Sequence, residues 1–140
     1  MHNAAMEFIF TSFHNWKGDR TDLNVLEIGS LDINGSVRPM FKPFQGNYVG
    51  IDMQEGPGVD IVADAAKFIN FEAYDVVVCA EVFEHTPDWK QIIYNCYNFL
   101  FHIRHSILYY FFYNRITLII YCCYRITMFI FTNFLKYNMM

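Results

Sequence analysis

The sequence predicts an α/β protein built on an open, mostly parallel sheet. The first observation is a set of four short apolar runs rich in β-branched residues: Leu23–Ile28, Tyr48–Ile51, Asp60–Ala63 and Tyr74–Ala80. The second is that each run ends at or beside an acidic residue. The third is that stretches with helical spacing of apolar residues flank the set. Short buried strands that alternate with helices and polar connections are typical of an α/β sheet.

The flanking helices have recognisable faces and starts. An amphipathic helix is expected over Ala5–Trp16, because its apolar residues recur at helical spacing: Met6, Ile9, Phe10, Phe13 and Trp16. After the fourth strand, Thr86, Pro87 and Asp88 supply an N-cap hydroxyl, a first-turn proline and a first-turn acid. The helix that follows, to about Leu100, has an apolar face made of Trp89, Ile92, Ile93, Cys96, Tyr97 and Leu100.

Four acids are expected at one edge of this sheet. Glu27, Asp52, Asp64 and Glu81 stand at or beside the carboxyl ends of the four strands in turn. Ligands of open α/β sheets bind outside the carboxyl ends of the strands. We therefore expect the four acids to border a ligand site.

The residues at this edge favour a nucleoside without phosphates. A dinucleotide would place its pyrophosphate on the loop after the first strand, where Glu27 would repel it, and that loop lacks the G-x-G-x-x-G pattern. Asp52 follows Gly29 by about 20 residues, the offset at which an acid reaches ribose hydroxyls. Asp64 is then placed to accept a hydrogen bond from an adenine amino group. S-adenosylmethionine, a nucleoside with a positive centre, fits these conditions, and an NAD(P)-binding oxidoreductase is the rival.

Five segments of the chain carry a family resemblance when they are taken in order. They are VLEIGS (25–30), NGSVRP (34–39), YVGIDM (48–53), GPGVDIVADA (56–65) and YDVVVCAEVFEH (74–85). Together they resemble the class I S-adenosylmethionine-dependent methyltransferases, and most closely the small methyltransferase type 11 domain. The resemblance covers about Asp22 to Leu100. It implies a Rossmann-like fold and methyl transfer to an acceptor that the sequence does not identify, with positioning as the main catalytic term.

The resemblance also implies which residues bind the cofactor. In chain order they are Glu27, Gly29, Ser30, Asp52, Met53, Asp64, Ala65, Ala80 and Glu81. The glycine loop and its leading acid approach the methionine portion, and the acid ending the second strand binds ribose. The end of the third strand faces the adenine amino group, and the end of the fourth borders the methionine and the acceptor. The second loop glycine, Gly35, lies further from Gly29 than in the common E-x-G-x-G-x-G form.

The acids and histidines have structural interpretations as well. Glu27 and Asp52 could be solvated strand-end acids, and Asp64 could cap a helix after it. His85 is the candidate for a general base, with packing beside the substrate as the alternative, so no catalytic residue is assigned. His102 and His105 lack the carboxylate or thiolate that would complete a metal site, and no metal is expected.

The charge and composition of the chain change abruptly after Asp88. All 14 acidic residues lie between Glu7 and Asp88, and the rest of the chain has five basic residues and no acid. No glycine or proline follows Pro87, and from Phe99 onward Phe, Tyr, Ile, Leu, Asn and Met dominate. A membrane segment, a nucleic-acid-binding tail or a frameshifted or read-through stretch would each explain this change, and we favour the last.

The first two explanations fit the tail poorly. Arg115 and Arg125 divide it too closely for a spanning helix of about 20 apolar residues, and its scattered charges form no basic patch for nucleic acid. We expect a cofactor-binding part over residues 1–100 and an atypical tail over 101–140. The fourth strand would then be an uncovered edge, which favours aggregation.

The expected location is the cytoplasm, because Met1–Phe13 shows no secretory signal. The alternative to an active methyltransferase is a non-catalytic, cofactor-binding remnant that associates with a membrane through its tail.

Overall fold

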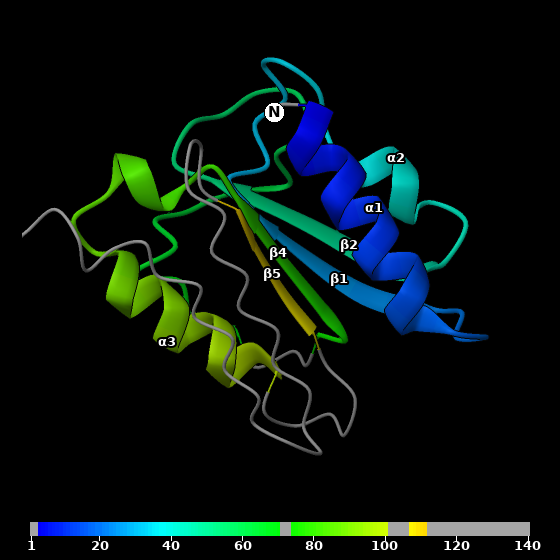
Figure 1. Cartoon of the computed structure of the whole chain (residues 1–140). Helices are drawn as coiled ribbons and strands as arrows, with labels where there is room; N and C mark the ends of the chain where they lie inside the picture. The colour runs from blue at the N-terminus through cyan, green and yellow to red at the C-terminus, as the bar shows by residue number, and fades with distance from the viewer. Residues whose placement is uncertain (1–2, 71–73, 101–106, 112–140) are drawn as a thin grey trace, which may run out of the picture.

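The computed structural model describes residues 3–70, 74–100 and 107–111. They form a five-stranded sheet in the order β3-β2-β1-β4-β5, with helices on both faces (Figure 1). The strands are β1 Leu23–Ile28, β2 Gln45–Asp52, β3 Ile61–Val62, β4 Val76–Ala80 and β5 Ile107–Phe111. The helices are α1 Asn3–Lys17, α2 Arg38–Phe41 and α3 Trp89–Leu100, and the 3-10 helix η1 covers Phe83–His85.

The order of the strands determines where a ligand site can form. The chain runs outward from β1 through β2 to β3, and then places β4 and β5 on the other side of β1. All four strand pairs are parallel, so the carboxyl ends of the strands open at one edge. The order reverses between β1 and β4, and ligands of such sheets bind at this switch point.

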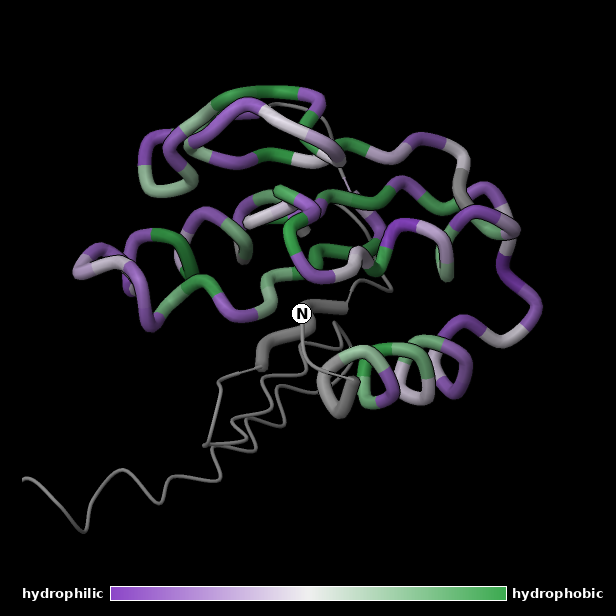
Figure 2. The backbone as a smooth tube through the Cα atoms, turned by 90° about the horizontal axis from the view of Figure 1, so that it is seen from above, coloured by the Kyte–Doolittle hydropathy of each residue, from purple (hydrophilic) through white to green (hydrophobic). Residues whose placement is uncertain are grey.

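The burial of β4 explains why helices lie on both faces of the sheet. All five residues of β4 are buried. Val76 and Val78 belong to one apolar cluster with residues of α1 and α2, whereas Val77 and Cys79 belong to a second cluster with residues of α3. Alternate residues of a strand point to opposite faces, so an unbroken apolar run needs cover on both. Figure 2 shows the hydrophobic stretches of the backbone in green.

The N-terminal helix packs as its apolar spacing predicted. Ile9 and Phe13 of α1 are buried. The ring centroid of Phe13 lies 4.6 Å from that of Phe41 in α2 and 5.6 Å from that of Phe44. The aromatic cluster fixes α1 and the short helix α2 over the same face of the sheet.

The elements predicted from the sequence are present, with shifts at some ends. β1 has the predicted bounds, and β4 begins later than predicted, at Val76. α3 ends at Leu100 as predicted but begins at Trp89, so Asp88 precedes its first turn, and the Thr86 hydroxyl accepts a hydrogen bond from the N–H of Asp88 at 3.1 Å. β2 begins earlier than predicted, at Gln45, and β3 is shorter, with only Ile61 and Val62.

The prediction that β4 forms an uncovered edge is wrong. β5 pairs in parallel with every residue of β4, from Val76 opposite Ile107 to Ala80 opposite Phe111. Two features favour this strand: its sequence, ILYYF, is β-branched and aromatic, and α3 supplies the crossover that parallel strands require. The sheet therefore continues beyond the predicted boundary at residue 100. The rest of the predicted tail, 101–106 and 112–140, lies outside the described residues.

Among the described residues, no helix has the length and apolar character needed to cross a membrane.

Candidate functional site

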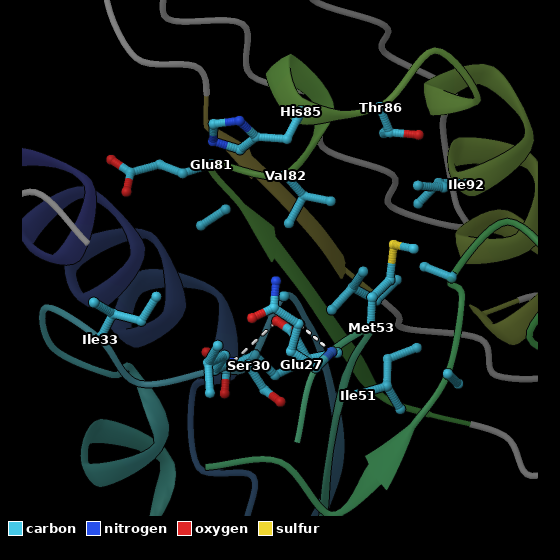
Figure 3. A pocket seen from close by; sticks show the side chains of 18 of the residues that line it. Glu27, Ser30, Ile33, Ile51, Met53, Glu81, Val82, His85, Thr86 and Ile92 are labelled. Atoms are coloured by element: carbon cyan, nitrogen blue, oxygen red, sulfur yellow. Dashed lines mark hydrogen bonds between the residues drawn. The ribbon is translucent and has the colours of Figure 1, made fainter. Parts of the chain in front are cut away.

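A cavity of about 540 Å³ lies at the carboxyl ends of β1, β2 and β4 (Figure 3). Small-molecule pockets typically measure about 300–1,000 Å³. All ten candidate residues from the sequence line this cavity: Glu27, Gly29, Ser30, Asp52, Met53, Asp64, Ala65, Ala80, Glu81 and His85. The fold therefore brings the predicted set together, and contact with a ligand remains a prediction for each member.

Gly29 turns the chain sharply at the end of β1. Its φ is +78°, in the left-handed region that favours glycine, and a Cβ placed on it would lie 2.4 Å from Cγ2 of Val82. The N–H groups of Gly29 and Ser30 both donate to the carbonyl oxygen of Ile51, at 2.9 and 3.1 Å. The turn thus holds the loop after β1 against the end of β2 and beside the segment that follows β4.

Asp52 connects this loop to the end of β2. Its Oδ2 accepts a hydrogen bond from the N–H of Leu31 at 3.2 Å, and its Oδ1 accepts one from the N–H of Gln54 at 3.0 Å. The residue is half-buried at the cavity wall. A carboxylate has about four lone-pair sites, so both oxygens keep capacity to accept hydrogen bonds from a ligand.

Asp64 caps a turn after β3, where the structural interpretation of this acid predicted a helix. Its Oδ1 accepts a hydrogen bond from the N–H of Ala66 at 2.9 Å, and its Oδ2 lies 2.9 Å from Nζ of Lys67. The hydrogen bond from Lys67, followed by that from Ala66, lowers the pKa of the Asp64 carboxyl. Its neighbour Ala65 is buried, and the carbonyl oxygen of Ala65 accepts a hydrogen bond from Nδ2 of Asn95 in α3 at 2.9 Å.

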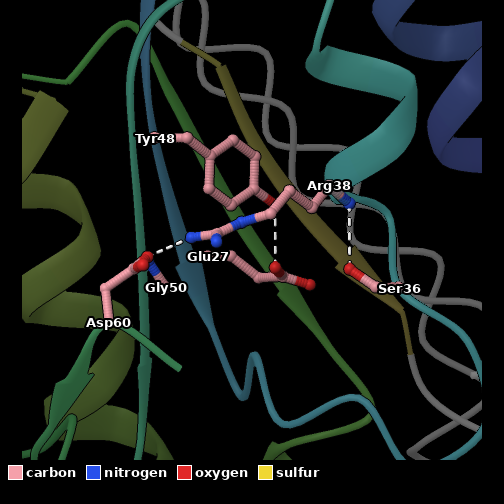
Figure 4. Close-up of polar contacts among 6 residues, drawn as sticks. All are labelled: Glu27, Ser36, Arg38, Tyr48, Gly50 and Asp60. Carbon is pink, nitrogen blue, oxygen red and sulfur yellow. Dashed lines mark hydrogen bonds and ion pairs between the residues drawn. The ribbon is translucent and has the colours of Figure 1, made fainter. Parts of the chain in front are cut away.

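Glu27 is a buried acid, with 3% of its surface exposed. The hydroxyl of Tyr48 donates a hydrogen bond to its Oε2 at 2.8 Å (Figure 4). Burial raises the pKa of the Glu27 carboxyl to about 7, although the Tyr48 hydrogen bond opposes this rise. Burial and the neighbouring Glu27 together raise the pKa of the Tyr48 hydroxyl. The expectation of a solvated strand-end acid therefore does not hold for Glu27.

Ser30 lies at the cavity with its hydroxyl turned into the protein. The residue is 2% exposed, and among the described residues its Oγ has no hydrogen-bond partner. A Cβ placed on Gly50 would lie 2.7 Å from this Oγ. The absence of a side chain at Gly50 therefore makes room for Ser30 where β1 and β2 approach each other.

The end of β4 forms the opposite wall. Glu81 has a φ of +56°, which is uncommon for a residue with a side chain. Val82 and the 3-10 helix η1 follow, and His85, at the end of η1, is exposed at the rim beside Glu81 (Figure 3). Ala80 is buried at the end of the strand.

The cavity is lined by acidic residues without lysine or arginine among the described residues. The four acids are Glu27, Asp52, Asp64 and Glu81. Lys67, which is paired with Asp64, lies outside this lining set. A cavity lined by one sign of charge concentrates ligands of the opposite sign. The site favours a cation over a phosphate-bearing anion.

Several residues of the site have no recognisable functional motif in the sequence. Val82 and Ile92 line it from the far wall, and Ile33 lines it from the loop after β1. Only their position in the sequence could have indicated a place in the site, because each is close to a predicted site residue or to the predicted start of a helix. The bond between Glu27 and Tyr48 was also missed, because hydroxyl-to-carboxylate pairing across strands leaves no periodic pattern.

The described residues hold no group of three or more histidine, cysteine or acidic side chains that could bind a metal ion. His102 and His105 lie outside the described residues.

No protein-family model and no curated protein sequence matches the chain. Solved structures do match it. The N-methyltransferase NodS from Bradyrhizobium japonicum WM9 is 19% identical with a TM-score of 0.58, and the match covers 77% of this chain and 68% of NodS. The plantazolicin methyltransferase BpumL in complex with SAH is 20% identical with a TM-score of 0.57, over 76% of this chain and 44% of BpumL.

A third match is coclaurine N-methyltransferase bound to N-methylheliamine and SAH, with 12% identity and a TM-score of 0.57. It covers 75% of this chain and 35% of the enzyme. The chain thus spans about a third to two thirds of the length of these neighbours. Likeness at these identities establishes the fold alone. The described part of the chain has the parallel, Rossmann-like fold of the class I methyltransferases.

Proposed function

We propose that the cavity binds S-adenosylmethionine and that the chain transfers its methyl group to an acceptor. One observation carries the proposal: the cavity at the switch point is lined by four carboxyl groups and by no lysine or arginine of the described residues. This charge suits a sulfonium and an ammonium group and opposes a pyrophosphate. The SAH named with BpumL and with coclaurine N-methyltransferase supports the same class of ligand.

The residues present fit this cofactor. The volume of about 540 Å³ is that of a small-molecule site. Gly29 has a positive φ and packs against Val82 without a Cβ, so the loop after β1 can turn tightly along the cavity. Asp52 keeps lone pairs for two ribose hydroxyls beyond the Leu31 and Gln54 bonds. Met53, 71% exposed at the rim, offers an apolar surface for an adenine ring.

The chemistry asks for alignment more than for acid–base groups. When bound, S-adenosylmethionine supplies an electrophilic methyl group on its sulfonium. Asp52 fixes the ribose, the loop from Gly29 to Gly35 excludes water on one side, and the end of β4 at Glu81 defines the side open to an acceptor. Holding the acceptor in line lowers the barrier by pre-organisation. His85 at the rim is the candidate to accept a proton from an acceptor that must lose one.

Ligand-dependent thermal unfolding tests the proposal. A ligand at 100 times its Kd stabilises the folded state by about 2.7 kcal/mol. We expect S-adenosylmethionine and S-adenosylhomocysteine to raise the Tm, with adenosine giving a smaller shift because it lacks the amino-acid end. ADP has the same nucleoside with two phosphates. If ADP raised the Tm as much as S-adenosylmethionine or more, the charge argument would be contradicted.

A further inference from the structure

The Glu27 carboxyl lies between the cavity and a cluster of polar side chains around Tyr48 and Arg38. It lines the cavity, yet only 3% of the residue is exposed. The partner that the structure gives it is the Tyr48 hydroxyl, at 2.8 Å. Tyr48 stands on β2 opposite Val25, and Glu27 stands opposite Gly50. The hydrogen bond therefore runs diagonally from β2 to β1, the two strands whose carboxyl ends border the cavity.

Tyr48 is itself packed against Arg38, which is fixed in turn by Asp60. The guanidinium of Arg38, in α2, lies over the Tyr48 ring, 4.6 Å from its centroid. Arg38 also forms an ion pair with Asp60, whose Oδ2 accepts a hydrogen bond from the N–H of Gly50 at 2.6 Å. Figure 4 shows these groups stacked beside Glu27. The cluster ties β1, α2, β2 and the turn before β3 to one carboxyl.

The charged groups near Glu27 act on its ionisation in opposite directions. Asp32 in the loop after β1 and Asp60 before β3 disfavour its ionised form, and Arg38 on α2 favours it. Burial outweighs these effects and brings the pKa of the Glu27 carboxyl to about 7, with Tyr48 opposing the rise. The group is thus close to half protonated at neutral pH, and it borders a cavity that favours a cation.

We propose that Tyr48 is a positioning residue that holds the Glu27 carboxyl at the cavity wall, and that a cationic ligand binds there with release of the Glu27 proton to solvent. The proposal rests on the proposed function, which supplies the cation. An opposite charge within about 4–6 Å favours the ionised carboxylate. The proton leaves the carboxyl oxygen, and the carboxylate that remains accepts the Tyr48 hydrogen bond and faces the ligand.

The direction of the pH effect follows from this linkage. Glu27 has a lower pKa in the complex than in the free protein. At pH values between these two pKa values, the free protein therefore carries more protons than the complex. Affinity should therefore rise with pH until Glu27 is ionised without ligand, slightly above pH 7. Below that pH, the affinity should fall by up to about tenfold for each pH unit, as long as Glu27 stays ionised in the complex.

Calorimetric titration of the full chain with S-adenosylmethionine, in phosphate and in Tris at pH 7, measures the released protons. The two buffers differ in ionisation enthalpy, so the difference in heat gives the number. We expect about half a proton per ligand for the wild type, and close to none for Glu27→Gln. Binding without proton release by the wild type, or equal release by Glu27→Gln, would overturn this proposal alone. No binding by a folded wild type would overturn the proposed function as well.

Tyr48→Phe tests the positioning role, with Tyr94→Phe as its control. Tyr94 is 60% exposed on α3 and lies outside the cavity lining, so its loss of a hydroxyl should change nothing. Loss of the Tyr48 hydroxyl should weaken binding about 3- to 10-fold and move the pH at which affinity levels off upward, because the carboxylate loses a donor. A lower Tm with an unmoved pH profile would show a merely structural tyrosine and would overturn the assignment.

Discussion

Gly29 and Val82 approach each other across the switch point of the sheet, closely enough that a Cβ on Gly29 would lie 2.4 Å from Cγ2 of Val82. The two residues follow β1 and β4, the central pair at which the strand order reverses. Val82 is β-branched and has little rotamer freedom with which to yield. The turn that opens the cavity therefore depends on the missing side chain of Gly29 as well as on its φ of +78°.

Replacement of Gly29 by alanine should destabilise the fold by about 2–4 kcal/mol, since backbone strain and overpacking each contribute. Cofactor binding should be lost with it. The control is Gly18→Ala, which has a φ of +55° with nothing within 4 Å of the added Cβ, and which should cost about 1 kcal/mol. Urea unfolding of both variants measures the difference. Equal costs would mean that Val82 moves aside freely.

Asp52→Ala should weaken binding of S-adenosylmethionine by about 1.5–3 kcal/mol, the worth of a charge-assisted pair of hydrogen bonds in a partly buried site. Asp19→Ala removes the same charge from an exposed residue outside the cavity lining and serves as the control. Isothermal titration of the two variants gives the comparison. If Asp52→Ala bound as tightly as Asp19→Ala, Asp52 would only connect the loop to β2.

The stability of the protein should fall as the pH rises from about 4.5 to about 7. The pKa of the Glu27 carboxyl is raised from 4.5 to about 7 on folding, so the folded state binds more protons than the unfolded state in this window. The free energy of unfolding then decreases with pH. Glu27→Gln should remove this dependence and gain on the order of 3 kcal/mol over the wild type at pH 8. Denaturant unfolding at pH 4.5 and 8 measures it; equal effects of the substitution at both pH values would contradict it.

The chain cut after residue 100 should be much less stable than the chain cut after residue 111. The shorter form lacks β5 and leaves the full length of β4 without a partner on that side. An exposed, apolar strand edge favours association, so the shorter form should elute as aggregates in size-exclusion chromatography. Indistinguishable elution and unfolding of the two forms would show that β5 adds nothing to the sheet.

The sequence predicted the cofactor half of the fold because each signal there was local. The LNVLEI run, the acid after YVGI and the apolar YDVVVCA run each mark a strand and its end, and parallel pairing brings those ends together without further information. Ten candidate residues therefore line one cavity. The ion pair of Asp64 with Lys67 was not predicted, because it depends on the geometry of the turn after β3.

Two features could not be predicted from local patterns. β5 follows a segment without glycine or proline, and its pairing depends on β4 offering an open edge and on α3 spanning the sheet. The buried bond of Glu27 to Tyr48 depends on which face of the sheet each side chain occupies, together with the cover that α1 and α2 supply. Both are tertiary relationships.

The most direct test of the central claim is a competition at one site between the proposed cofactor and a dinucleotide. Calorimetric titration of the full chain with S-adenosylhomocysteine, and then of the saturated complex with NAD, compares the two ligands under the same conditions. The acid-lined cavity predicts saturable binding of S-adenosylhomocysteine and no displacement by NAD. Tighter binding of NAD, with displacement of S-adenosylhomocysteine, would contradict the assignment of this cavity to a methyl-transfer cofactor.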